Sequence, residues 1–188
     1  MHLPNPEWIG LAFGVSEAAL SWWRRSSSGV RHRDDRGSLR LIWIVTAIAM
    51  TVAMLCWRFL PQARVSMSLA WQVASLAIFV GGLLLRWYSI LYLGKYFTVD
   101  VAVAADHKVI DTGPYRTIRH PSYTGALLAF LGLTLYMGNV ASLIVVMTAV
   151  LFVFMRRIRI EEQVLQAGLG QSYTDYMQRT KRLIPFVY

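Results

Sequence analysis

The sequence is poor in cysteine and in acidic residues. A single cysteine, Cys56, among 188 residues excludes a disulfide scaffold and a metal or iron–sulfur site built from thiolates. Ten Asp and Glu stand against 19 Lys and Arg, which gives a formal net charge of +9. Hydrophobic residues nevertheless make up 56% of the chain, above the roughly 45–50% of a soluble domain. A basic and apolar chain either binds nucleic acid or lies in a membrane, and the positions of its charges decide between these classes.

The common signatures of catalysis are also missing. The sequence has neither a G-x-G-x-x-G nor a Walker loop. No serine stands at a recognisable spacing from a histidine and an aspartate, and the four histidines form no metal-ligand pattern. We therefore expect no metal site and no nucleophile of the usual kind.

Long stretches of the chain are almost free of charge. Residues 41–60 contain only Arg58 and residues 69–93 only Arg86, while 123–155 contain no charged residue. One membrane crossing needs about 20 residues. Because Gly138-Asn139 is a turn signal, the last stretch is predicted to form a hairpin of two helices. The predicted fold is all-α, a polytopic membrane bundle of about five transmembrane helices at about 7–23, 41–60, 69–93, 121–137 and 139–158.

The basic residues predict the orientation of this bundle. Segments 24–40, 94–120 and 156–188 hold 16 of the 19 Lys and Arg. The positive-inside rule then places them in the cytoplasm, with the N-terminus outside and the C-terminus cytoplasmic. Arg58 and Arg86 lie near helix ends, where they can snorkel to the interface. Because the charges mark a membrane side rather than one folded face, no nucleic-acid partner is expected.

Two regions follow from this organisation. Residues 1–93 are predicted to form the N-terminal transmembrane helices, with a basic cytoplasmic linker at 24–40. Its residues 24–38 are expected to be a flexible, solvated or headgroup-binding segment. Residues 94–188 are predicted to form a cofactor-binding region, with the helical hairpin 121–158 and a cytoplasmic C-terminal segment of helix and loop. Structured polar pieces lie only in this second region, so we expect the working site there, on the cytoplasmic side.

Polar residues gather at the two ends of the predicted hairpin. Arg119 and His120 precede Pro121, whose missing N–H costs nothing at a helix start. The free N–H groups there favour an anion, although an ordinary helix entry would also explain them. The hairpin returns the chain to the same side, so Glu161 and Glu162 are expected near Arg119 and His120. A salt-bridged helix face is the plain alternative for the two glutamates.

Aromatic residues complete the set. Tyr115 lies in a Gly-Pro-Tyr turn, and Tyr173 and Tyr176 share one face of a short helix predicted at 171–180, where interfacial anchoring is the plain alternative. Carboxylates can hold amines and ribose hydroxyls, and aromatic rings can cover a base. S-adenosylmethionine fits this set, and NADPH would use many of the same groups.

The order of the motifs resembles a known family. GPYRTIRHPSYTG, a hydrophobic hairpin, RIRIEEQVL and a terminal Y-x-x-Y…R-x-I-P resemble the isoprenylcysteine carboxyl methyltransferase (ICMT) family of integral membrane enzymes, over about residues 92–188. The resemblance implies S-adenosylmethionine as cofactor, a lipidic acceptor from the membrane, and transfer of a methyl group to a carboxylate at the cytoplasmic face. A phenol or thiol acceptor and the oligomeric state stay open.

The resemblance also implies site residues. Arg119, Arg157 and His120 are the expected catalytic residues. The expected cofactor-binding residues are His120, Tyr123, Gly125, Glu161, Glu162, Tyr115, Tyr173, Tyr176 and Arg182.

Two other functions are compatible with these motifs. An NADPH-dependent membrane sterol-type reductase would share the RHPxY segment and a C-terminal IP-x-x-Y, but the paired glutamates favour the methyltransferase. A non-catalytic membrane scaffold would tolerate replacement of the motif residues.

Overall fold

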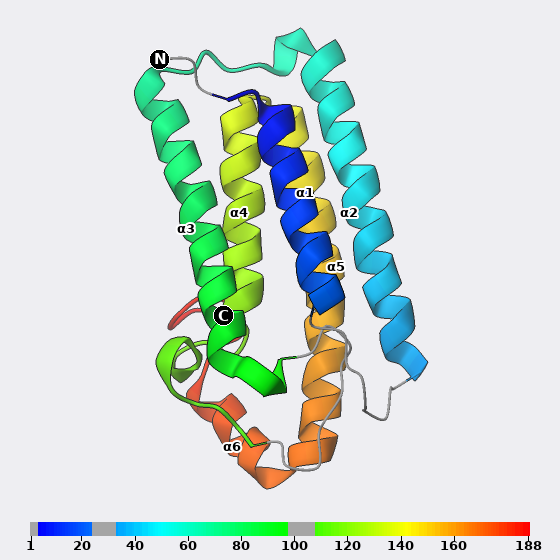
Figure 1. The fold of residues 1–188 in the computed structure, drawn as a ribbon, viewed down its shortest axis with the longest axis vertical. Coiled ribbons are helices and arrows are strands. Elements are labelled where there is room, and N and C mark those ends of the chain that lie inside the picture. Colours follow the sequence, from blue (N-terminus) through cyan, green and yellow to red (C-terminus); the bar gives the residue numbers. More distant parts are fainter. Residues whose placement is uncertain (1–3, 24–32, 98–107) are drawn as a thin grey trace.

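The chain folds into a bundle of antiparallel helices. The computed structural model describes residues 4–23, 33–97 and 108–188. Within these ranges five long helices lie side by side with alternating direction, and a short sixth helix lies beyond one end (Figure 1). They are α1 (Pro6–Trp23), α2 (Arg33–Phe59), α3 (Leu69–Leu93), α4 (Pro121–Met137), α5 (Val140–Leu169) and α6 (Gln171–Arg179). Short 3₁₀ helices occur at η1 (Pro61–Ala63), η2 (Gly94–Tyr96) and η3 (Gly113–Arg116). The predicted all-α class is confirmed.

Large apolar side chains cover the outside of this bundle. Trp22 is 79% exposed and Phe152 is 64% exposed, and many Leu, Ile and Val side chains of α2 and α3 also face outward. Three stretches of the described chain are long and apolar enough to cross a membrane: Gly37–Phe59, Leu69–Tyr96 and Val140–Leu169. An apolar surface of this extent needs a lipid cover. The predicted integral membrane character is confirmed, while the count of five spans stays a prediction.

The hairpin of α4 and α5 forms where the sequence predicts it. Pro121 is the first residue of α4, and Gly138 ends that helix with φ of 61°, in the left-handed region that favours glycine. The Asn139 side chain accepts a hydrogen bond from the Ser142 N–H at 3.0 Å and so caps α5. Its amide also donates to the Leu60 carbonyl at 3.1 Å, which ties the turn to the end of α2.

Glycines let α3 and α4 cross in close contact. A Cβ on Gly125 would lie 2.5 Å from the Arg86 backbone nitrogen, and a Cβ on Gly82 would lie 2.6 Å from the Gly125 carbonyl oxygen. Gly132 meets the backbone of Phe79 in the same way. Gly81 has nothing within 4 Å of such a Cβ. The crossing therefore needs small residues on one face of each helix, and it fixes the start of α4 against α3.

The flexible segment predicted at 24–38 is wrong for residues 33–38. α2 begins at Arg33, so residues 33–40 are helical, and residues 24–32 lie outside the described ranges. Ser38 is buried and its hydroxyl accepts a hydrogen bond from Arg157 of α5. Contact with α5 keeps the start of α2 helical although its sequence has no apolar periodicity. Tertiary packing outweighs the local sequence pattern here.

Candidate functional site

Backbone hydrogen bonds join the segment before α4 to the segment after α6. The Arg119 N–H donates to the Lys181 carbonyl at 2.7 Å, and the Lys181 N–H donates to the Thr117 carbonyl at 3.0 Å. One residue further, the His120 N–H donates to the Arg182 carbonyl at 3.1 Å. These bonds place the R-H-P-x-Y-x-G block beside the C-terminal R-x-I-P block. The end of the chain thereby becomes part of the site at the start of α4.

Glu162 of α5 is the centre of a buried charge network. Its Oε1 accepts a hydrogen bond from Arg119 Nε at 3.0 Å, and its Oε2 accepts one from Arg182 Nη2 at 2.8 Å. His120 Nε2 lies 3.3 Å from the same Oε1. A buried carboxylate needs such partners to offset its lost hydration. Glu162 therefore locks α5 to the start of α4 and to the C-terminal segment, as the hairpin predicts.

Glu161 points elsewhere, because adjacent residues of a helix project about 100° apart. Its Oε2 accepts a hydrogen bond from the Tyr123 hydroxyl at 2.9 Å, and its Oε1 lies 4.0 Å from His120 Nδ1. The Glu161 side chain is 28% exposed, against 5% for Glu162. Of the two acids, Glu161 is the one with a carboxylate open to a ligand.

A cavity lies at this end of the bundle, between the end of α3, η3, α5 and α6. We call it the outer cavity. Tyrosine rings and leucine side chains make most of its wall, and its charged and imidazole groups come from Glu161, His120, Arg119 and Lys108. Its wall is formed by Leu93, Tyr96, Lys108, Val109, Ile110, Tyr115, Arg119, His120, Glu161, Leu165, Leu169, Tyr173 and Tyr176.

The tyrosines of the outer cavity are fixed neutral groups. Burial raises the pKa of Tyr115, Tyr173 and Tyr176, and the charge of Glu161 raises those of Tyr115 and Tyr173 further. The Tyr176 hydroxyl donates to the Tyr115 carbonyl at 2.7 Å, and the Tyr115 hydroxyl donates to the Ser89 carbonyl at 3.1 Å. These bonds hold two of the rings at set positions in the wall.

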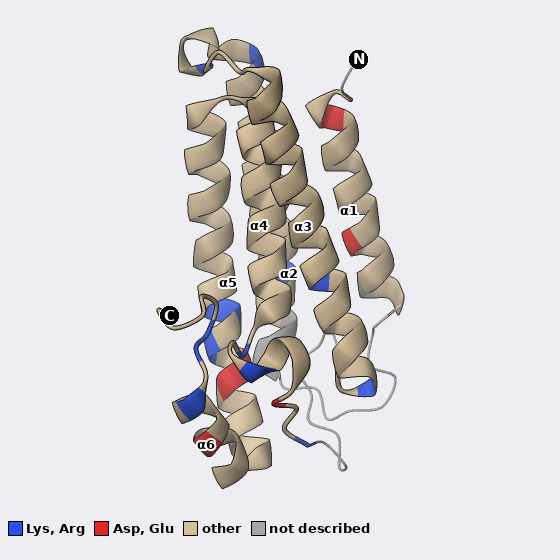
Figure 2. Ribbon diagram, turned by 90° about the vertical axis from the view of Figure 1, so that its left-hand side faces the viewer, with Lys and Arg blue, Asp and Glu red and all other residues tan. Residues whose placement is uncertain are grey.

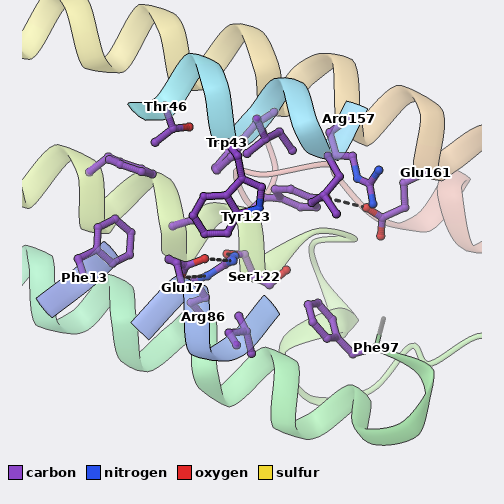
Figure 3. Close-up of a pocket in the computed structure, with 16 residues that line it drawn as sticks. Phe13, Glu17, Trp43, Thr46, Arg86, Phe97, Ser122, Tyr123, Arg157 and Glu161 are labelled. Atoms are coloured by element: carbon purple, nitrogen blue, oxygen red, sulfur yellow. Dashed lines mark hydrogen bonds and ion pairs between the residues drawn. The ribbon is translucent and has the colours of Figure 1, made fainter. Parts of the chain in front are cut away.

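A second cavity lies between the helices, adjacent to the first. We call it the inner cavity (Figure 3). Arg157 and Glu161 lie at one end of it and Phe13 at the other, with Tyr123, Glu17 and Arg86 between them (Figure 3). Apolar side chains form most of its wall: Phe13, Leu20, Leu39, Ile42, Trp43, Phe97, Ala126, Phe130 and Phe154. Glu161 lines both cavities and so marks their boundary.

The structure separates the predicted site residues into groups. Tyr115, His120, Tyr173 and Tyr176 line the outer cavity, and Glu161 lines both. Tyr123 and Arg157 line the inner cavity. Arg119 borders the outer cavity, yet its guanidinium already binds Glu162 and the carbonyls of Met177 and Thr180.

The remaining predicted residues line neither cavity and contact the residues that do. Glu162 and Arg182 bind each other, and Arg182 also donates to the Tyr188 hydroxyl at 2.9 Å. Gly125 lies at the crossing of α3 and α4, against the Arg86 backbone. Among the described side chains, no group of three or more His, Cys, Asp or Glu is arranged to hold a metal ion.

One ion pair in the inner cavity differs from the prediction. Arg86 was expected to snorkel, but its Nε and Nη2 each donate to a carboxylate oxygen of Glu17 at 2.6 Å. Its Nη1 also donates to the Ser122 carbonyl at 3.2 Å. A Glu inside one apolar helix and an Arg inside another are a signal of pairing, because an unpaired charge is costly in a membrane. That signal would have located Glu17 and Arg86 from the sequence.

Fold and site together define a class, a polytopic helical membrane protein with two adjoining cavities at one end of its bundle. Residues 75–167 match the sequence model of the isoprenylcysteine carboxyl methyltransferase (ICMT) family. The resemblance predicted from the motifs is confirmed.

Named relatives agree with this assignment. Protein-S-isoprenylcysteine O-methyltransferase B of Arabidopsis thaliana is 33% identical over 114 residues, which cover 60% of this chain and 58% of the relative. Protein-S-isoprenylcysteine O-methyltransferase of Schizosaccharomyces pombe is 30% identical over 119 residues, which cover 62% and 50%. The solved eukaryotic intramembrane Ras methyltransferase ICMT matches with a TM-score of 0.64 and 28% identity, over 77% of this chain and 52% of that one. The chain thus spans about half the length of these proteins.

Proposed function

We propose that this protein transfers a methyl group from S-adenosylmethionine to a lipidic acceptor, with a prenylcysteine-type carboxylate as the acceptor class. The main support is the position of Glu161, at the boundary between a tyrosine-lined cavity and a mostly apolar one. The names of the relatives support carboxylate methylation rather than reduction by NADPH.

The residues of the outer cavity fit a cofactor of this kind. The Glu161 carboxylate would hold its cationic part, and the rings of Tyr115, Tyr173 and Tyr176 would cover its base. His120 would contribute a hydrogen-bonding nitrogen. When bound, S-adenosylmethionine supplies a methyl group on a positively charged sulfur, and the protein supplies orientation.

The inner cavity fits an amphipathic acceptor. Its aromatic and aliphatic wall would take the apolar chain, and Arg157, buried beside the boundary, would hold one oxygen of the acceptor carboxylate. A carboxylate is already ionised at neutral pH, so no general base is needed. Burial between helices removes part of its hydration, which favours transfer. For a phenol or thiol acceptor, His120 would accept the proton.

We further propose that the end of the bundle with both cavities faces the cytoplasm and that all five long helices span the membrane. Most of the Lys and Arg drawn in Figure 2 lie at that end. This distribution supports the proposal, because cytoplasmic segments carry an excess of basic residues.

Calorimetry on the purified full chain in detergent tests the cofactor assignment. S-adenosylmethionine and its demethylated product are expected to bind at one site, each competing with the other. NADPH is expected not to displace them. Heat from NADPH binding, with none from S-adenosylmethionine or its demethylated product, would overturn the proposal in favour of the reductase.

A further inference from the structure

The inner cavity changes character along its length. One end carries Arg157 and Glu161, the paired Glu17 and Arg86 lie between, and the far end carries Phe13 of α1 (Figure 3). The lining residues of α4 run from Ser122 to Phe130, a distance of about 12 Å at 1.5 Å per residue. A chain that enters with its polar group at Glu161 therefore points its tail at Phe13 and Phe130.

Phe13 and Phe130 close the far end together. Their ring centroids lie 4.9 Å apart at an interplanar angle of 72°, and Phe13 packs edge-on against Phe79 at 5.8 Å. All three rings are buried. Edge-to-face contacts of this kind fix rings in place. The wall is therefore formed by Phe13 of α1 and Phe130 of α4, and Phe79 of α3 packs against Phe13 outside the lining.

The bundle is tightly packed beyond this wall. Leu133, which follows Phe130 by one turn of α4, and Val150 of α5 are completely buried, as is Ala53 of α2. Close-packed interiors leave no room for another carbon chain. The cavity thus ends at Phe13 and Phe130 rather than continuing toward the other end of the bundle.

We propose that Phe13 and Phe130 set the maximum length of the apolar chain that the protein accepts. The identity of that chain as part of a methyl acceptor rests on the proposed function, whereas the length limit rests on the cavity. Phe13 of α1 lies outside the residues matched to the family, whereas Phe130 of α4 lies within them.

The test measures binding of S-alkyl-N-acetylcysteines with straight chains of about 6 to about 16 carbons to the purified full chain. Each buried CH₂ is expected to raise the affinity about fourfold until the tail meets the wall. In Phe13→Ala and Phe130→Ala the rise is expected to continue for at least two further carbons. Ala126→Phe, which fills the cavity one turn before the wall, is expected to end the rise at a shorter chain.

Matched variants separate this effect from general damage. Phe152→Ala removes the same ring from an outward-facing position of α5 and is expected to leave the length profile unchanged. Phe13→Leu keeps more of the packing than Phe13→Ala, so it tests the same shift if the alanine variant does not fold.

The outcomes distinguish the length limit from the proposed function. If methyl transfer occurs but the affinity depends on chain length in the same way in the wild type and in the Phe13, Phe130 and Ala126 variants, the length limit is wrong. The proposed function would then still stand. Shifted binding profiles without methyl transfer to any probe would support the limit and contradict the function. Failure of the wild type to bind any probe would overturn the length limit.

Discussion

Glu161 and Glu162 are adjacent in the sequence but have different surroundings. Glu162 is held by Arg119 and Arg182 and is almost completely buried. Glu161 receives one hydrogen bond from Tyr123 and faces both cavities. Glu162 therefore stabilises the site, and Glu161 is available to a ligand.

Replacement of Glu162 is expected to destabilise the protein. Glu162→Gln leaves the Arg119 guanidinium buried without its carboxylate, and such a loss costs about 3 kcal/mol. Thermal unfolding in a fixed detergent should show a clear fall in Tm. An unchanged Tm would contradict the supporting role assigned to Glu162.

Replacement of Glu161 is expected to affect binding instead. Glu161→Gln can still accept the Tyr123 hydrogen bond, so its Tm should stay close to that of the wild type. Loss of the negative charge should weaken binding of S-adenosylmethionine by about tenfold to a hundredfold, as expected for one charged contact. Calorimetry of this variant beside Glu162→Gln measures the difference. Equal affinity in Glu161→Gln and the wild type would remove Glu161 from the ligand site.

The sequence predicts part of this residue-scale picture. The helical period indicates that two adjacent acids cannot serve one salt bridge, and the hairpin brings them to Arg119 and His120. The choice of which acid is buried could not be predicted. It depends on Arg182, whose position is set by backbone pairing of two segments about 60 residues apart without a strand-like pattern.

At the scale of helices, the crossing of α3 and α4 positions the site. Gly125 and Gly82 let the two backbones meet, and Arg86 beside them reaches Glu17 and Ser122. The start of α4 is therefore fixed from two sides, by α3 and by the C-terminal segment.

Gly125→Ala tests this crossing, with Gly81→Ala as its matched control. The added Cβ at Gly125 would overlap the Arg86 backbone, so overpacking of about 1–3 kcal/mol is expected. At Gly81 the new Cβ meets open space, and alanine is the better helix former by about 1 kcal/mol. Thermal unfolding should therefore separate the two variants, with Gly125→Ala lower. Equal Tm values would contradict the close approach of the helices.

The sequence predicts some helix boundaries and not others. Pro121 and Gly138-Asn139 predict the hairpin correctly because proline and glycine act on the local backbone. α5 continues through Glu161 to Leu169 instead of ending near 158, because the polar run after the apolar stretch still favours a helix. The end of an apolar stretch predicts the membrane boundary and not the end of the helix.

At the scale of the whole molecule, the proposed function needs both cavities at one membrane face. Substituted cysteines on a Cys56→Ser background test the proposed orientation. A membrane-impermeant maleimide should label Gln62→Cys, in η1, on intact cells. It should label Gln178→Cys, in α6, only after permeabilisation. Both glutamines are exposed, so accessibility in the folded protein is matched. The reverse pattern would place the site on the opposite side.

The central claim is methyl transfer at the boundary of the two cavities. Its most direct measurement uses purified full chain, methyl-labelled S-adenosylmethionine and an N-acetyl-S-prenylcysteine. We predict a base-labile methyl ester on the acceptor with the wild type, and a strong loss of that product with Glu161→Gln. A folded wild-type protein that forms no labelled ester would contradict the account.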